Sequence, residues 1–129
     1  MLWTESKDKL ALGYWDIQGR AHPVRWLLAY YRIGWEDKQY KDRSEWYDKD
    51  KPALSSDFPN LPYIKDGDLV ITETFAVLHA IKTGNKDLFG KNTLDAIKLS
   101  QLSSFIGDAR NILKDLFLTK NLKRSKMTF

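Results

Sequence analysis

Hydrophobic positions in the first third of the chain predict a strand, a helix and a second strand. Residues 10–15 form a short β-prone run that stops at the turn signal Asp16-Ile-Gln-Gly19. Apolar residues then recur at helical spacing between His22-Pro23 and Gly34; proline suits a first helical turn and glycine suits a C-terminal stop. Residues 35–41 return to a strand-like pattern. These elements predict a β-α-β unit.

The next part of the chain predicts a loop, a hairpin and another helix. Residues 42–57 are polar, and we expect an irregular loop there with a short helix. Two apolar runs, at 58–64 and 69–71, are joined by an Asp-Gly turn sequence, which favours a β-hairpin. Residues 72–84 show helical spacing, with a threonine at position 72 or 74 able to cap the helix.

Taken together, these elements predict an α/β (α+β) fold with a small mixed sheet. The order βαβ followed by ββα implies one parallel and one antiparallel strand pair. Residues 93–118 continue as one long helical pattern. One side of that helix carries an apolar stripe, made up of Leu102, Phe105, Ile106, Ala109, Ile112, Leu113 and Leu116.

The composition excludes several classes of protein and site. Hydrophobic residues make up 43% and charged residues 29% of the 129 positions, which excludes a largely disordered chain. Without cysteine there is no disulfide and no thiolate metal site, and two histidines are too few for an all-imidazole site. No apolar run is long enough to span a membrane, and the first residues lack a secretory signal. These absences predict a cytoplasmic protein without a bound metal.

The positive charge of the chain gathers near its C-terminal end. The formal net charge is +4, and residues 114–129 alone hold five basic and one acidic side chain. The remaining residues therefore balance at zero. We expect a basic tail over residues 119–129, either as a solvated end or as a contact for nucleic acid or anionic lipid.

Four segments follow one another in a characteristic order and spacing. They are Leu12-Gly-Tyr-Trp-Asp-Ile-Gln-Gly-Arg-Ala-His-Pro-Val-Arg25, Arg43-Ser-Glu-Trp46, Asp57-Phe-Pro-Asn-Leu-Pro-Tyr63 and Ile71-Thr-Glu-Thr74. Together they resemble the cytosolic glutathione transferases, most closely the mu class, with some sigma-like features near His22. The resemblance implies a thioredoxin-like glutathione-binding domain over residues 8–85. It also implies that residues 92–118 are a single helix of a truncated all-helical domain.

The resemblance implies an enzyme that joins the thiolate of glutathione, as co-substrate, to a small apolar electrophile without a further cofactor. Tyr14 matches the family's catalytic tyrosine. A free thiol has a pKa of about 8.5, so little thiolate exists at neutral pH. A hydroxyl that donates a hydrogen bond to sulfur favours the anion. Lowering the pKa by two units requires about 2.7 kcal/mol of differential stabilisation.

Further positions match the family's glutathione-binding residues near the glycyl end of the tripeptide. Trp15 matches a residue that borders glutathione. Arg43 and Trp46 match the loop that reaches the glycyl carboxylate, an anion suited to a cation and an indole N–H. The family's lysine falls on Lys51, with Lys49 as the alternative, because this loop is one residue longer than the mu pattern.

Two later segments match the remaining contacts to the tripeptide. Asn60 and Leu61 match the backbone that pairs with the cysteinyl part, and Pro62 resembles the family's cis-proline. Glu73 and Thr74 replace a mu-class Gln and Ser at a helix N-terminus, which favours a carboxylate. Thr74 would hold the γ-glutamyl carboxylate and Glu73 the ammonium group. Helix capping is the alternative role for both.

The resemblance also predicts a homodimer and a reduced activity. Phe58 matches the aromatic key that a mu-class subunit inserts into its partner. Family members have a second domain of several helices, so we expect a truncated or short relative whose electrophile pocket is largely missing. The long helix lacks the mu-class electrophile-site tyrosine. Its apolar stripe, left uncovered, predicts that the chain associates with itself.

Two other functions fit the same residues. The chain could bind glutathione without catalysing a transfer, or it could be a protein-interaction module with a transferase-like fold. In the second case the basic tail would contact RNA or an acidic partner. Neither alternative involves a membrane or a metal.

Overall fold

The computed structural model describes residues 10–83, 88 and 90–126, and the chain divides into two compact units at residues 86 and 87. The first unit contains the predicted thioredoxin-like domain, and the second contains the long helix. Residues 8–9 and 84–85 of the predicted domain, and the last three residues of the predicted tail, lie outside the described part of the chain.

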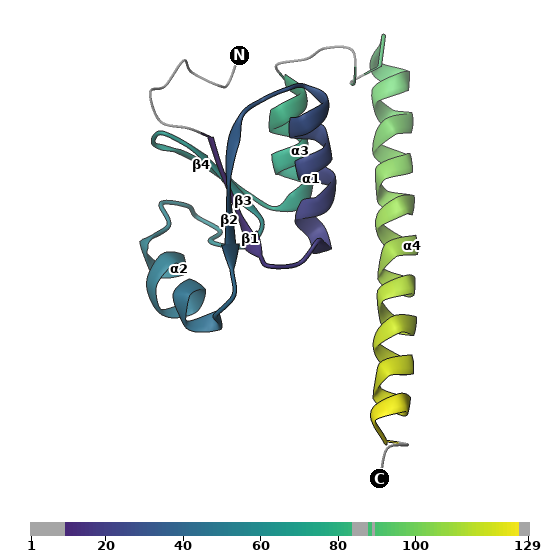
Figure 1. Ribbon diagram of the computed structural model, residues 1–129. Coiled ribbons are helices and arrows are strands. Elements are labelled where there is room, and N and C mark those ends of the chain that lie inside the picture. Colours follow the sequence, from purple (N-terminus) through teal and green to yellow (C-terminus); the bar gives the residue numbers. More distant parts are fainter. Residues whose placement is uncertain (1–9, 84–87, 89, 127–129) are drawn as a thin grey trace. The chain divides into compact units, whose positions relative to one another are not determined.

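A four-stranded mixed sheet lies at the centre of the first unit (Figure 1). Its strands are β1 (Leu10–Trp15), β2 (Trp35–Tyr40), β3 (Tyr63–Asp66) and β4 (Leu69–Thr72), and their spatial order is β2-β1-β3-β4. β1 pairs in parallel with β2, and β3 pairs antiparallel with β4, as the sequence predicts. A second antiparallel pair, β1 with β3, joins these two halves into one sheet.

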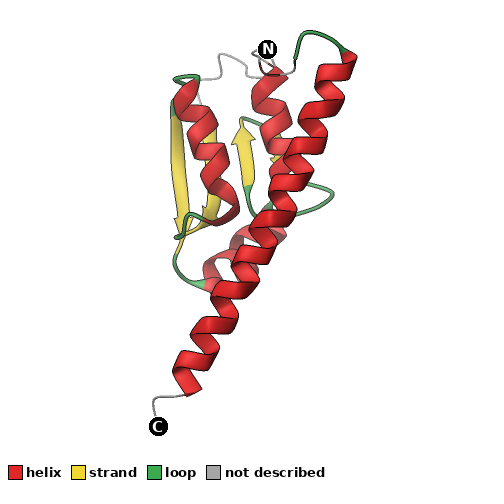
Figure 2. Cartoon of the chain, turned by 90° about the vertical axis from the view of Figure 1, so that its right-hand side faces the viewer, coloured by secondary structure: helices red, strands yellow, loops and turns green. Residues whose placement is uncertain are grey.

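Helices pack on the sheet from both sides (Figure 1). A 3₁₀ turn, η1 (Gly19–Ala21), leads into α1 (His22–Tyr30), which lies beside α3 (Thr74–Thr83) (Figure 2). The opposite side carries a π-helical turn, η2 (Glu45–Asp50), and the short helix α2 (Lys51–Ala53). The predicted loop with a short helix at residues 42–57 is therefore confirmed.

The core under α1 and α3 is aliphatic. Leu12 of β1, Val24 and Leu28 of α1, and Val77 and Ile81 of α3 are all fully buried. In each helix the two residues are four positions apart and so share one face. Burying an aliphatic side chain of this size stabilises the fold by about 1.5–3 kcal/mol. This face fixes both helices on the sheet.

The core on the other side is aromatic. Trp46 of η2 is 2% exposed and stacks on Tyr63 of β3, with ring centroids 6.0 Å apart. Trp46 also packs against Tyr40 of β2. The ring of Tyr63 lies over Gly13, where an added Cβ would stand 2.1 Å from its Cε1 atom. Glycine is therefore required at that position of β1.

The hairpin begins later than its hydrophobic run predicts. Residues 58–62 are irregular, and the strand starts at Tyr63, because Pro62 has no N–H to donate to a sheet. Thr72 is the last residue of β4 and does not cap α3. Its hydroxyl donates instead to the carbonyl oxygen of Phe58 at 2.8 Å.

The second unit is dominated by one helix, α4 (Thr93–Lys126), which is eight residues longer than predicted. Asn92 caps its start: Asn92 Oδ1 accepts the Asp95 N–H at 3.0 Å, and Asp95 Oδ2 accepts the Lys91 N–H at 3.0 Å. At the other end, the basic residues from 120 to 126 are good helix formers and suit a helix C-terminus. Most of the predicted tail is therefore helical.

Arg25 ties α1 to β2 and to the loop after β1. Its Nε atom lies 3.1 and 3.0 Å from the two carboxylate oxygens of Asp37, and its Nη1 donates to the Ile17 carbonyl at 3.1 Å. The Arg25 side chain is only 14% exposed. The loop after the first strand is thus held by a charge-assisted network.

We expect Arg25→Met to lower the free energy of unfolding by about 2 kcal/mol, because the carboxylate of Asp37 and the carbonyl of Ile17 lose a charged donor. Lys41→Met is the matched control. Lys41 is 78% exposed and 4.0 Å from Asp16, so its loss should change stability by less than about 0.5 kcal/mol. Urea unfolding measures both, and equal losses would show that the Arg25 network contributes no more than a surface ion pair.

Candidate functional site

The candidate site residues lie at one end of the sheet, at or next to the ends of its strands. Gly13 of β1 pairs with Tyr63 of β3, which pairs with Thr72 of β4. The next residues outward on these three strands are Tyr14, Pro62 and Glu73. The parallel strand β2 also finishes at this end, where Tyr40 pairs with Trp15 and leads into the loop that carries Arg43 and Lys51. Four segments far apart in the sequence are thereby brought together.

Tyr14 is held under the loop that follows β1. The side chain is 6% exposed, and its hydroxyl oxygen accepts the Arg20 N–H at 3.1 Å. Gly19 has a φ of +42°, and an added Cβ there would stand 2.7 Å from the Tyr14 hydroxyl. Glycine is thus needed both for its conformation and for its close approach. Because the hydroxyl accepts from the backbone, its own proton is available for another acceptor.

The side chains of Arg43 and Lys51 both form cation–π contacts with the ring of Tyr47. The Arg43 guanidinium carbon lies 5.2 Å from the ring centroid, and the Lys51 Nζ lies 5.6 Å from it. The ring of Trp15 packs against the same tyrosine, with centroids 6.0 Å apart. Three residues that the resemblance singled out thus meet at Tyr47, which the sequence analysis did not identify. A pair of cations on one exposed ring favours an anion between them.

Trp46 and Lys49 lie outside the cluster that surrounds Tyr47. The indole of Trp46 is part of the aromatic core, stacked on Tyr63. Lys49 is exposed, and no cation–π contact joins it to Tyr47 among the described residues. Of the two candidate lysines, Lys51 is the one that contacts the Tyr47 ring together with Arg43.

Asn60, Leu61 and Pro62 form the turn before β3. The Leu61–Pro62 peptide bond is cis, and both side chains are buried. The Leu61 N–H donates to the Asn60 Oδ1 at 2.9 Å. Asn60 Nδ2 donates to Glu73 Oε1 at 2.7 Å, which links this turn to the end of β4. The two segments are therefore held together.

Glu73 connects β4 to α3 in a left-handed conformation. Its φ is +69°, which non-glycine residues adopt rarely, so the surrounding structure must hold it there. The Glu73 carbonyl accepts the Val77 N–H at 2.9 Å and so starts the helix. Thr74 is the first residue of α3 and is half-buried. The carboxylate of Glu73 and the N-terminus of α3 thus lie next to each other.

The Phe58 side chain is exposed at the surface, next to the turn formed by Asn60, Leu61 and Pro62. Its side chain is 74% exposed, although its backbone is fixed at both ends. The Phe58 N–H donates to Ser56 Oγ at 3.2 Å, and its carbonyl accepts the Thr72 hydroxyl. A shallow groove lined by Leu54, Ile71 and neighbouring residues lies alongside. The Phe58 ring is therefore exposed to solvent, while hydrogen bonds hold its backbone in place.

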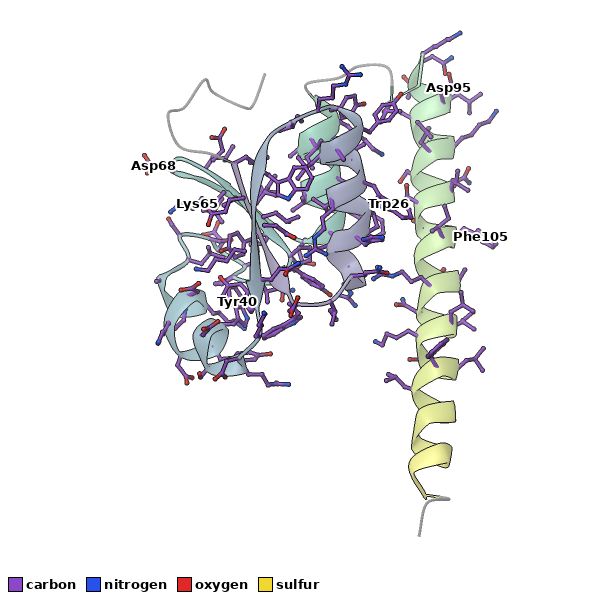
Figure 3. The ribbon with its side chains drawn as sticks, in the orientation of Figure 1. Trp26, Tyr40, Lys65, Asp68, Asp95 and Phe105 are labelled. Carbon is purple, nitrogen blue, oxygen red and sulfur yellow. The ribbon has the colours of Figure 1, made fainter. Side chains whose placement is uncertain are left out.

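A polar network that the sequence does not predict lies beneath the Arg43–Lys51 loop. Tyr40, labelled in Figure 3, donates its hydroxyl to Asp50 Oδ2 at 2.6 Å and lies 3.0 Å from the Tyr63 hydroxyl. Lys38 Nζ forms an ion pair with the same oxygen of Asp50. The signal available in the sequence was indirect: buried tyrosines require a partner for their hydroxyls. The partner itself depends on how the loop folds back.

The network shifts the pKa of each of its charged members. Burial alone would raise the pKa of the Asp50 carboxyl, but the hydrogen bonds from Lys38 and Tyr40 outweigh it and lower the pKa below its ordinary value. The hydrogen bond to Asp50 raises the pKa of Lys38. Burial, followed by the hydrogen bond to Asp50, raises the pKa of Tyr40. Asp50 is thus ionised and Tyr40 protonated at neutral pH.

Two other classes of site were tested on the described residues. Within residues 10–83, 88 and 90–126, His, Asp and Glu side chains form no group of three that could hold a metal ion. None of the helices in this part of the chain is both long and apolar enough to cross a membrane.

Comparison with known proteins gives one consistent result. The model of the glutathione S-transferase N-terminal domain matches residues 10–82. A glutathione S-transferase of Tyrophagus putrescentiae is 38% identical over 127 residues, which cover 95% of this chain and 57% of the relative. Glutathione S-transferase Mu 6 of Mus musculus is 36% identical over 128 residues, covering 93% and 57%.

A solved structure supports the same assignment. The crystal structure of the glutathione S-transferase Blo t 8 matches with a TM-score of 0.73 and 34% identity, over 81% of this chain and 49% of that one. The chain thus spans about half the length of the relatives it matches. The chain belongs to the glutathione S-transferase family, with its N-terminal domain at residues 10–82 and mu-class enzymes among its relatives.

Proposed function

We propose that this chain binds glutathione at the described end of the sheet and transfers its thiolate to a small apolar electrophile. The observation that carries the proposal is the convergence there of Tyr14, Pro62 and Glu73. The names of the relatives, all glutathione S-transferases, support the activity. Glutathione is the co-substrate of this reaction, and no other cofactor is required.

In the proposed reaction Tyr14 stabilises the attacking thiolate. Its hydroxyl accepts the Arg20 N–H, and so its proton can be donated to the sulfur of glutathione. The bond from Arg20 polarises the hydroxyl and makes it a better donor. The thiol of glutathione releases its proton to water, and the thiolate sulfur then forms the new bond to the electrophilic carbon, whose leaving group departs with the bonding electrons. Tyr14 keeps its proton throughout, because its role is to stabilise charge.

The remaining contacts would hold the two ends of the tripeptide. Arg43 and Lys51, both on Tyr47, suit the glycyl carboxylate, with Trp15 packed on the same ring. Trp46 supports this loop from the aromatic core. The Glu73 carboxylate suits the γ-glutamyl ammonium. The Thr74 hydroxyl and the N-terminus of α3 suit the γ-glutamyl carboxylate. The backbone of Asn60 and Leu61 would pair with the cysteinyl part.

We also propose that the chain forms a homodimer or larger assembly in the cytoplasm. Phe58 is exposed on a fixed backbone, as expected of a side chain that enters a partner. On α4, six large side chains of the apolar stripe are more than half exposed. A second copy of the chain could cover both surfaces. The same exposure is the observation that favours the alternative, a protein-interaction module with little or no transferase activity.

The first test is glutathione binding by calorimetry at millimolar concentrations. We expect heat from binding, and an affinity reduced about tenfold by Lys51→Met, since one charge-assisted contact is lost. Lys49→Met serves as the matched control and should bind like the wild-type chain. A loss confined to Lys49→Met would reassign the lysine, whereas the absence of any heat from the wild-type chain would favour the interaction module.

The second test separates binding from chemistry. Tyr14→Phe should bind glutathione with nearly unchanged affinity, yet its turnover with an aryl halide at pH 6.5 should fall about ten- to a hundredfold, as a thiol pKa raised by one to two units implies. The deficit should shrink at high pH, where the thiol ionises unaided. Equal rates for wild type and variant at pH 6.5 would contradict the assignment of Tyr14.

The third test concerns assembly. Sedimentation at micromolar concentration should show a dimer or larger species, and we expect Phe105→Ser or Phe58→Ser to shift it toward the monomer. Ile17→Ser is the control, because Ile17 is an exposed apolar residue outside both surfaces. A single 15.1 kDa species with a cooperative thermal transition would show that the wild-type chain is a stable monomer.

A further inference from the structure

The loop between β2 and α2 contains a π-helical turn. The Lys51 N–H donates to the Trp46 carbonyl, five residues earlier, whereas an α-helix would pair it with residue 47. A π turn accommodates one extra residue within a helical segment. It therefore changes the side of the turn on which the residues after it lie.

The π turn decides which side of the loop each charged residue occupies. In an α-helix, one added residue rotates everything after it by about 100°. Here Trp46 lies in the aromatic core, while Lys51 and Arg43 both contact the ring of Tyr47. Two cations on a single ring repel each other. A carboxylate bound between them would relieve that repulsion.

Asp50 fixes the opposite side of the turn to the sheet. Its Oδ2 atom accepts the Tyr40 hydroxyl at 2.6 Å and pairs with Lys38 of β2. Tyr40 is 2% exposed, so the anchor reaches into the core. Lys38 also neutralises the carboxylate, which reduces its repulsion of an anion bound at Lys51. Asp50 and Lys51 are adjacent in sequence, but Asp50 bonds to residues of β2 and Lys51 contacts the ring of Tyr47.

We propose that Asp50 is a positioning residue: by holding the π turn against Tyr40 and Lys38, it keeps Lys51 on the Tyr47 ring that Arg43 also contacts, where the two cations receive the glycyl carboxylate of glutathione. This inference rests on the proposed function, because it names how that site is assembled. Asp50 itself does not contact the ligand. Its effect should therefore depend on whether the ligand carries a glycyl charge.

The test compares two probes by calorimetry: glutathione, and its monoester at the glycyl carboxylate. Asp50→Ala should weaken glutathione binding about three- to tenfold and change binding of the monoester less than twofold. Asp48→Ala is the matched control, because Asp48 is an exposed carboxylate in the same turn, with no hydrogen bond or ion pair to the described residues. It should leave both affinities unchanged. Asp50→Asn, which retains an acceptor for Tyr40, should restore part of the loss.

The outcomes separate this inference from the proposed function. Equal loss for the two probes, or no loss for either, would overturn the role of Asp50 while leaving glutathione binding intact. A wild-type chain that binds neither probe would overturn the proposed function and this inference together. If Asp50→Ala does not fold, Tyr40→Phe removes the hydroxyl that donates to Asp50 and contacts the Tyr63 hydroxyl, and the same selective loss is expected of it.

Discussion

The pairing of β1 on both of its edges is the constraint on which the proposed site depends. β1 runs parallel to β2 and antiparallel to β3, so the carboxyl ends of β1 and β2 meet the start of β3 at one end of the sheet. That geometry is possible only because Gly13 leaves room for the ring of Tyr63. A side chain at position 13 would displace Tyr63, and with it the aromatic layer that supports η2. The position of Tyr14 and that of the Arg43–Lys51 loop thus have a common origin.

Electrostatic networks fix the two loops that the sheet alone leaves free. Arg25 holds the loop after β1 through Asp37 and the Ile17 carbonyl, and Asp50 holds the loop after β2 through Tyr40 and Lys38. In both cases a largely buried charged side chain has one partner of opposite charge, Asp37 or Lys38, and one neutral hydrogen-bond partner, the Ile17 carbonyl or the Tyr40 hydroxyl. Such contacts are directional, unlike apolar burial, and so they determine the conformation of a loop as well as its attachment.

The sequence predicted local features well and tertiary contacts poorly. Hydrophobic periodicity located β1, α1, the hairpin and the start of α4, because each depends on neighbours along the chain. Resemblance supplied Tyr14 and the cis bond before Pro62, which no periodicity could indicate. The role of Asp50 was missed because its partners lie 10 and 12 positions away on β2. The prediction that Thr72 caps α3 was wrong for the same reason. The hydroxyl of Thr72 donates to the carbonyl of Phe58, which lies 14 positions away.

Binding and chemistry rest on separate parts of the proposed site, and this separation follows from the fold. The Tyr14 hydroxyl is set by the loop after β1, through Gly19 and the Arg20 N–H. The cations on Tyr47 are set by the loop after β2, through the π turn. The two loops meet at Tyr40, whose carbonyl accepts the Asp16 N–H and whose hydroxyl donates to Asp50, but the bond to the Tyr14 hydroxyl and the contacts on the Tyr47 ring are made by different residues. A change in one loop can therefore alter affinity for the tripeptide while the acidity of its thiol is preserved, and the reverse holds for the other loop.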